Sequence, residues 1–89
     1  RGGPVTAAAP PGEYLRDELA ERGWTGGQFA EMIGRPYQVI SMILCGRKGI
    51  TTETAFQIGD ALGTGPEVWL NLQTAWRCAE YRRLAGRDS

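Results

Sequence analysis

The residues best suited to chemistry lie between Glu31 and Glu53, and their types favour binding over catalysis. Polar and thioether side chains recur there at helical intervals, at Tyr37, Gln38, Ser41 and Met42. Residues with that spacing share one face of a helix. Such a helix fits the major groove of DNA, where its N-terminal residues meet the edges of the bases.

The sequence offers few groups of residues that could form a catalytic or metal-binding site. It contains no His, and its two cysteines, Cys45 and Cys78, are too far apart to form a C-x-x-C pair. Ser/His and Cys/His nucleophile pairs are therefore excluded, and a zinc site is not expected. Carboxylate or Lys chemistry stays open as an alternative. We expect no enzyme activity, no metal and no cofactor, and we interpret both cysteines as small packing residues.

The charged residues are distributed unevenly along the chain. Ten Lys and Arg balance ten Asp and Glu, so the formal charge is zero. The segment between Glu31 and Glu53 nevertheless has no acid and three bases, which gives it +3 and leaves −3 for the rest. The three bases are Arg35, Arg47 and Lys48. This asymmetry suits a protein that presents one face to phosphate groups.

Apolar residues in the same region predict two short helices that meet at a tight turn. The helical spacing is interrupted once, at Gly34, where a positive φ angle costs a glycine little. The apolar positions on either side are Phe29, Ala30, Ile33, Ile40, Ile43 and Leu44. A small residue such as Ala30 lets the two helix backbones approach closely. This pattern indicates a helix-turn-helix whose second helix reads DNA.

Helix start signals extend the pattern beyond these two helices. The segment 12–22 is amphipathic, with an acid early and a base late. Thr25 and Gln28 form a T-x-x-Q capping box at the start of the next helix. Thr51 or Thr52 caps a fourth helix that ends near residue 62. No strand is needed to explain any part of the sequence.

The final helix is predicted from Thr64 and Glu67, which have the spacing of a capping box, and it reaches about Leu84. The result is an all-α fold, a compact domain of five helices, which suits 89 residues with 42% apolar composition. We divide the chain into a flexible N-terminal arm at 1–11, a DNA-binding and dimerisation domain at 12–84, and a C-terminal tail at 85–89.

The last helix is more apolar than a lone surface helix requires. One apolar stripe consists of Val68, Trp69, Leu72, Ala75, Trp76 and Ala79. Further apolar residues occupy the neighbouring positions. We expect part of this surface to meet the same helix of a second copy. The expected dimer contacts are Leu70, Trp76, Tyr81 and Leu84. The alternative is that the other four helices cover both faces.

The order of these motifs resembles the HigA/VapI-type antitoxins, a branch of the lambda-repressor-like (XRE) helix-turn-helix regulators. The matching pieces are PGEYLRDEL, FAEMIG, QVISMILCGRKGIT and ALGTGPEVWLNLQ. The resemblance implies a homodimer that binds a palindromic operator upstream of its own gene. It also implies a protein partner, a toxin of the RelE/HigB-like mRNA endonuclease class, which the antitoxin neutralises.

The resemblance assigns roles to individual residues. Base edges would be read by Tyr37, Gln38, Ser41 and Met42, and an amide such as Gln38 can pair with adenine at N6 and N7. Arg47 and Lys48 occupy the basic loop that follows the reading helix and would contact phosphates.

Three residues depart from the pattern of the resembling family. Gly26 stands where many relatives have a polar side chain, so only its backbone N–H can meet a phosphate. Arg35 replaces an apolar residue and would add a phosphate contact. Pro36 replaces the usual Ser or Thr cap, which removes a side-chain cap from the reading helix. These changes affect the operator sequence more than the fold.

Other functions fit parts of the same sequence. A stand-alone XRE-family transcriptional regulator would need no toxin, and a pure protein-interaction module would not need the acid-free segment. A DNA-binding part of a metallopeptidase would need an H-E-x-x-H motif, which this chain lacks because it has no His. With no apolar stretch long enough for a membrane span, we expect a cytoplasmic bacterial protein without membrane contact.

Overall fold

The computed structural model describes residues 9–86, which form five helices joined by short loops. They are α1 (Pro11–Arg22), α2 (Gly26–Ile33), α3 (Tyr37–Leu44), α4 (Thr52–Leu62) and α5 (Glu67–Gly86). The described residues contain no strand, so the all-α prediction is confirmed. Most of the predicted arm, residues 1–8, and residues 87–89 of the predicted tail lie outside the described range.

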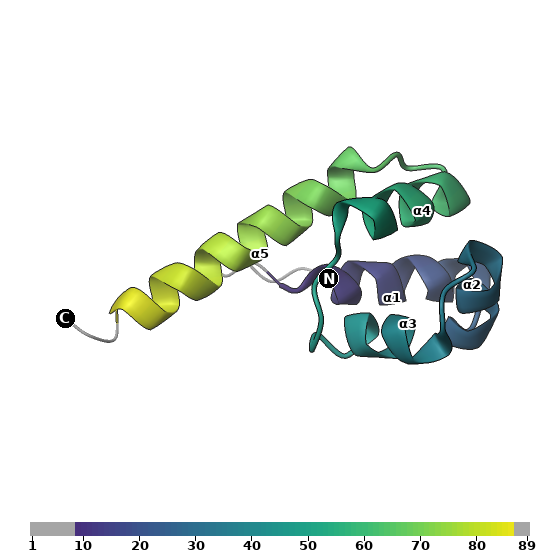
Figure 1. Ribbon diagram of the computed structural model, residues 1–89, viewed down its shortest axis with the longest axis horizontal. Coiled ribbons are helices and arrows are strands. Elements are labelled where there is room, and N and C mark those ends of the chain that lie inside the picture. The colour runs from purple at the N-terminus through teal and green to yellow at the C-terminus, as the bar shows by residue number, and fades with distance from the viewer. Residues whose placement is uncertain (1–8, 87–89) are drawn as a thin grey trace.

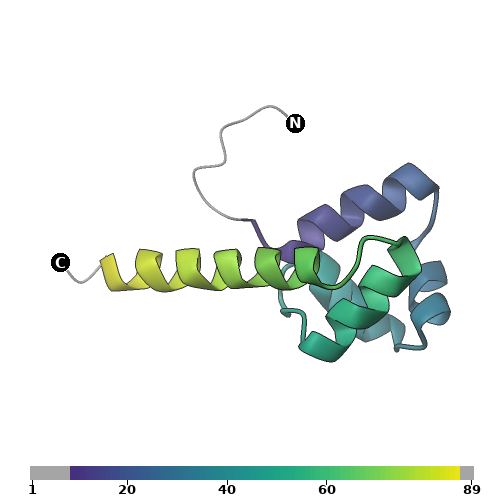
Figure 2. The same cartoon turned by 90° about the horizontal axis from the view of Figure 1, so that it is seen from above.

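Helices α1 to α4 and the first half of α5 pack around one hydrophobic core, while the second half of α5 extends away from this body (Figures 1 and 2). The core consists of Leu15, Leu19, Phe29, Ala30, Ile40, Ile43, Ile50, Ala55, Ile58, Leu62 and Trp69. Trp69 is the only buried residue of α5. The last helix therefore contributes one large anchor to the core.

The predicted turn and most of the predicted caps are confirmed. Gly34 ends α2 with φ +72°, and the Thr25 and Gln28 side chains form both hydrogen bonds of the capping box. At the start of α4 the cap is Thr51, whose hydroxyl accepts from the Thr54 N–H. These local signals hold because each depends on residues at most three positions apart.

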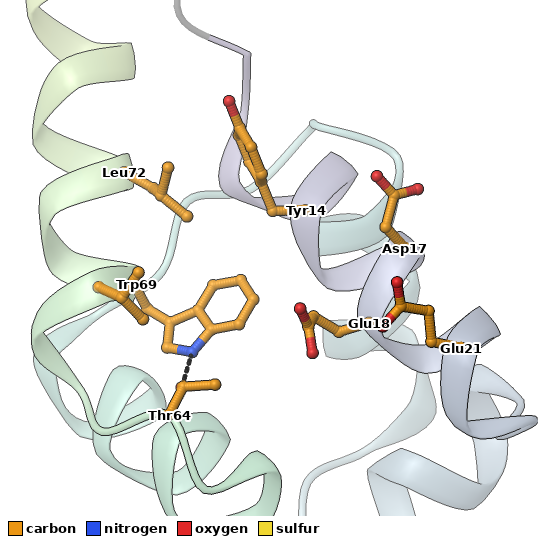
Figure 3. Close-up of a pocket in the computed structure, with 8 residues that line it drawn as sticks. Tyr14, Asp17, Glu18, Glu21, Thr64, Trp69 and Leu72 are labelled. Carbon is orange, nitrogen blue, oxygen red and sulfur yellow. Dashed lines mark hydrogen bonds between the residues drawn. The ribbon is translucent and has the colours of Figure 1, made fainter. Parts of the chain in front are cut away.

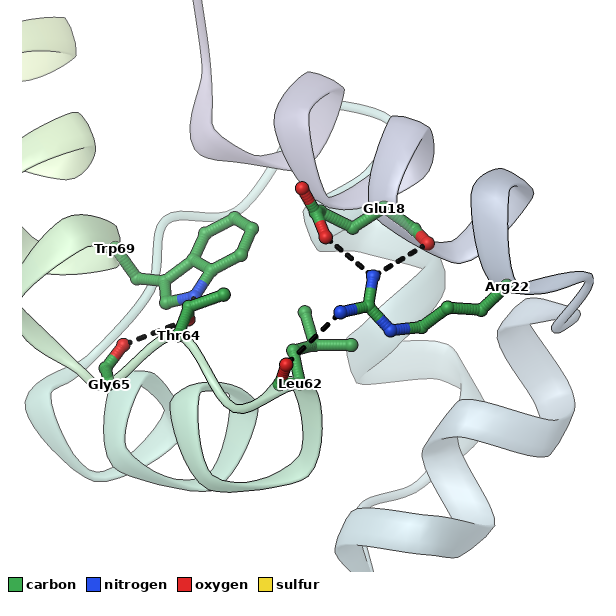
Figure 4. A network of polar contacts seen from close by, with 6 residues as sticks. All are labelled: Glu18, Arg22, Leu62, Thr64, Gly65 and Trp69. Atoms are coloured by element: carbon green, nitrogen blue, oxygen red, sulfur yellow. Dashed lines mark hydrogen bonds and ion pairs between the residues drawn. The ribbon is translucent and has the colours of Figure 1, made fainter.

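The predicted capping box of Thr64 and Glu67 is wrong. Helix α5 begins at Glu67, and the Pro66 carbonyl accepts the first helical hydrogen bonds, so Thr64 lies too early to cap it. The Thr64 hydroxyl instead accepts from Nε1 of Trp69 at 2.8 Å (Figure 4). A buried indole needs an acceptor for its N–H, and Thr64 supplies one.

The first turn of α1 lies directly against the end of α3. A Cβ built on Gly12 would lie 1.8 Å from the Ile43 carbonyl oxygen, so no other residue fits without a shift of the backbone. One turn later, an Nη2 of Arg16 donates to the Leu44 carbonyl at 2.6 Å. Arg16 thus satisfies a carbonyl at the end of α3 that has no helical partner.

The other end of α1 is tied to α4 by a cluster around Arg22. Its guanidinium donates to the Glu18 carboxylate and, at 3.0 Å, to the Leu62 carbonyl at the end of α4 (Figure 4). The same guanidinium lies 5.7 Å from the ring centroid of Trp24. Both ends of α1 are therefore fixed to the helices that they cross.

The contact at Gly12 generates a stability prediction with a matched control. We expect Gly12→Ala to lower the free energy of unfolding by about 2 kcal/mol or more, because the new methyl group would overlap the α3 backbone. Gly27→Ala is the control, since its Cβ would meet only ordinary contacts at 3.9 and 4.0 Å. That variant should be unchanged or up to about 1 kcal/mol more stable. Urea unfolding of both measures the difference; equal stabilities would contradict the close contact.

Candidate nucleic-acid interface

Helix α3 has one buried face and one open face. Ile40 and Ile43 are buried in the core, with Val39 and Leu44 half-buried beside them. The opposite face carries the four residues predicted to read bases, of which Ser41 is half-buried and the others are exposed: Tyr37, Gln38, Met42. The packing of α3 therefore leaves this face accessible along the whole helix.

The start of α3 has no side-chain cap, as the sequence predicted from Pro36. Pro36 has φ −59° and ψ 143°, and its carbonyl accepts from the Val39 N–H at 3.0 Å. The first N–H groups of a helix have no partner within the helix and carry its positive dipole end. The exposed Tyr37 and Gln38 thus stand at an end suited to negatively charged groups.

Gly26 and Tyr37 are neighbours in space. A Cβ built on Gly26 would lie 3.3 Å from Cε1 of Tyr37 and 3.3 Å from Cδ1 of Leu44. A side chain at position 26 would therefore have to displace the Tyr37 ring or the Leu44 side chain. The glycine at position 26, which departs from the family pattern, thus leaves room for the ring of Tyr37. Sequence spacing does not reveal this relation.

Arg35 lies across the loop between α2 and α3 and contacts α4. Its Nε donates to Oε1 of Gln57 at 2.7 Å, and its Nη2 lies 3.3 Å from a carboxylate oxygen of Glu53. The side chain is 25% exposed. The geometry gives Arg35 a structural partner on α4, and its charge is partly offset by Glu53.

Arg47 and Lys48 lie in the loop that follows α3, and both are exposed. Their backbone N–H groups donate to the Met42 carbonyl at 2.9 and 3.2 Å, which wraps the loop around the end of the helix. Neither side chain has an ion pair within residues 9–86. Two exposed cations thus stand beside the open face of α3.

A side chain of α5 also holds this basic loop in place. Oε1 of Gln73, on α5, accepts from the Ile50 N–H at 2.9 Å. A Cβ on Gly49 would lie 2.5 Å from Nε2 of Gln73, so the loop passes close to α5 there. The supporting roles of Gln73 and Arg16 were missed by sequence reasoning, because both act on segments more than twenty positions away.

The expected dimer residues divide along α5. Leu70 and Trp76 are half-buried, and Leu70 packs against the core. Farther out, Tyr81 is 74% exposed and Leu84 is 53% exposed. Within the described residues, helices α1 to α4 do not cover the outer half of α5.

Sequence comparison assigns this chain to a family. Residues 15–70 match the helix-turn-helix family, a segment that begins within α1 and ends within α5. The chain belongs to the helix-turn-helix family. An uncharacterized helix-turn-helix-type transcriptional regulator of Escherichia coli, YddM, is 33% identical over 70 residues, covering 79% of this chain and 74% of YddM. Virulence-associated protein I of Dichelobacter nodosus is 34% identical over 70 residues, covering 78% of this chain and 65% of that protein.

Solved structures narrow the similarity to antitoxins of the helix-turn-helix family. A HigA-family addiction module antidote protein from Coxiella burnetii is 32% identical with a TM-score of 0.87, covering 93% of this chain and 91% of that one. The Pseudomonas aeruginosa antitoxin HigA, solved with the higBA promoter, is 27% identical with a TM-score of 0.86, covering 91% and 89%. The predicted resemblance to HigA/VapI-type antitoxins is confirmed.

Among the described residues, no helix is both long enough and apolar enough to cross a membrane.

Proposed function

We propose that this helix-turn-helix protein is the antitoxin of a HigBA-type toxin-antitoxin module and represses its own operon as a dimer in the bacterial cytoplasm. The open face of α3 carries the proposal, since it combines exposed polar side chains with two exposed cations at its end, Arg47 and Lys48, which form no ion pair among residues 9–86. The similarity to the Pseudomonas aeruginosa HigA, which was solved with promoter DNA, supports promoter DNA as a partner of this chain.

The interface divides into groups that read bases and groups that hold phosphates. Tyr37, Gln38, Ser41 and Met42 would face base edges, with Gln38 able to make two hydrogen bonds to adenine. Phosphates would meet the backbone N–H of Gly26 and the side chains of Arg47, Lys48 and Arg35. Arg35 contributes least, because Gln57 and Glu53 already occupy its donors.

A second copy of the chain is the partner that α5 requires. Tyr81 and Leu84 leave apolar surface exposed on a helix end that no other described element covers. Pairing with the same helix of another copy would bury this surface together with Leu70 and Trp76. A two-fold dimer would also present two copies of α3 to a palindromic site, with half-sites about 34–36 Å apart.

Variants on the open face of α3 and its loop test the DNA half of the proposal. We expect Gln38→Ala to reduce the preference for the operator over mutated operators by about 1–3 kcal/mol, because it removes a base contact. Arg47→Ala should weaken all DNA alike and lower the salt slope of log K by about one unit, because it removes one phosphate contact. Fluorescence anisotropy over a series of salt concentrations measures both. The reverse pattern would overturn the division of roles.

A pair of equally exposed apolar residues tests the dimer. We expect Leu84→Asp to convert the protein to a monomer, because it would bring two carboxylates into the interface between the α5 helices. Phe56→Asp, on α4, is the control, since Phe56 is 51% and Leu84 53% exposed. Sedimentation equilibrium should give a dimer for wild type and Phe56→Asp. Equal association constants for all three would rule out the α5 interface.

Co-expression tests the antitoxin half. We expect a small basic open reading frame beside the gene for this chain. Its product should inhibit growth, and the tagged chain should co-purify with that product and restore growth. A stand-alone regulator, the alternative function, would repress its operator but capture no such protein. Growth inhibition that persists in the presence of folded, operator-binding protein would exclude the antitoxin role.

A further inference from the structure

A groove with an acidic rim lies between α1 and α5, on a surface that the DNA-binding proposal does not use. Its volume is about 390 Å³. One wall is formed by α1 and the other by the start of α5 (Figure 3). The lining residues are Tyr14, Asp17, Glu18, Glu21, Thr64, Val68, Trp69 and Leu72.

The groove combines an apolar floor with three carboxylates along one side, those of Asp17, Glu18 and Glu21. Tyr14, Trp69 and Leu72 face each other across it, and carboxylates stand along the α1 side (Figure 3). One of these carboxylates, Glu18, is paired with Arg22, whereas Glu21 is exposed. The chemistry fits an occupant that brings arginine or lysine together with an apolar stem.

The chain carries a surface with the complementary chemistry at the far end of α5. Residues 74–86 contain three arginines and one glutamate, so this segment has a net charge of +2. Arg83 is paired with Glu80 at 2.7 Å, while Arg82 is exposed. Tyr81 and Leu84, both exposed, supply apolar surface on the same segment. One molecule thus carries both an acidic groove and a basic, partly apolar helix end. Two copies can therefore make the same contact in both directions.

The length of α5 brings these two surfaces together in a two-fold dimer. The helix runs from Glu67 to Gly86, so its centre lies between Trp76 and Arg77. If two copies of α5 pair antiparallel about that point, residues 81–86 of one lie beside residues 67–72 of the other. Val68, Trp69 and Leu72 in that stretch line the groove.

We propose that the groove between α1 and α5 receives the basic end of α5, at Arg82 and Arg83, from a second copy of the chain. The inference rests on the dimer under the proposed function and adds a second, electrostatic contact to its α5 pairing. Each dimer contains two such contacts, one for each groove. They favour the antiparallel pairing over a parallel one, because only the antiparallel pairing brings unlike charges together.

A charge exchange on the full-length chain tests the contact. We expect Glu21→Lys and Arg82→Glu each to raise the dimer dissociation constant about fivefold or more at low salt, since each places like charges together at both grooves. The chain with both substitutions should return to within about threefold of wild type, because the charges attract again in reversed order. Sedimentation equilibrium gives the constants, and far-UV circular dichroism checks that every variant is folded.

Matched controls carry the same charge changes elsewhere. Asp60→Lys alters an exposed acid on α4, and Arg47→Glu alters an exposed base in the loop after α3. Both should dimerise like wild type, although Arg47→Glu should lose DNA affinity. If Asp60→Lys raises the dimer dissociation constant as much as Glu21→Lys does, only the overall charge matters. The proposed groove contact would then be wrong.

The remaining outcomes separate the groove from the dimer. One outcome is that wild type dimerises, Leu84→Asp does not, and Glu21→Lys leaves the dimer dissociation constant unchanged. The α5 pairing would then be supported, and the groove contact would be wrong. If the doubly substituted chain is no tighter than its single parents, the contact is also wrong. If Glu21→Lys abolishes capture of the adjacent gene product while the dimer persists, a partner protein occupies the groove instead. A wild-type chain that stays monomeric like Leu84→Asp overturns both proposals.

Discussion

The close contact between the first turn of α1 and the end of α3 is the constraint on which the open face of α3 depends. Helix α3 has eight residues and no side-chain cap, and a helix this short is not stable by itself in water. It is held by the burial of Ile40 and Ile43, by the backbone contact at Gly12, and by the hydrogen bond from Arg16 to the Leu44 carbonyl. The orientation of its open face is therefore set by its packing against α1 together with α2.

Sequence reasoning could predict the features that depend on local spacing. The helices, the turn at Gly34, the caps at Thr25 and Thr51, and the exposed face of α3 all follow from residues within a few positions of each other. Thr64 shows where that reasoning fails. Its spacing to Glu67 matches a capping box, but the N–H of buried Trp69 takes the hydroxyl. The indole is buried only by tertiary packing, and once buried its N–H needs an acceptor. That hydrogen bond is formed in place of the capping box that the local spacing predicts.

Long-range pairing also offsets part of the positive charge that the sequence predicts. The sequence gives the segment between Glu31 and Glu53 three bases, but Glu53, at its boundary, lies close to Arg35 in the fold. The positive charge available to a phosphate is thus concentrated at Arg47 and Lys48, with the helix N-termini of α2 and α3 supplying partial charge. An ion pair 18 positions apart has no signature in sequence spacing, so the role of Arg35 could only be narrowed by the structure.

Helix α5 shows a related limit, because its apolar stripe continues past the point at which the core ends. Spacing could indicate which face is apolar, but the extent of its burial depends on how far α1 and α4 reach along it. Helix α1 contacts both α3 and α5. A dimer built through α5 therefore positions α3 through one intervening helix whose two ends are fixed, at Gly12 and at Arg22. The separation of the two α3 helices in such a dimer would be set by rigid packing. Binding to two half-sites at a fixed spacing requires a fixed separation of this kind.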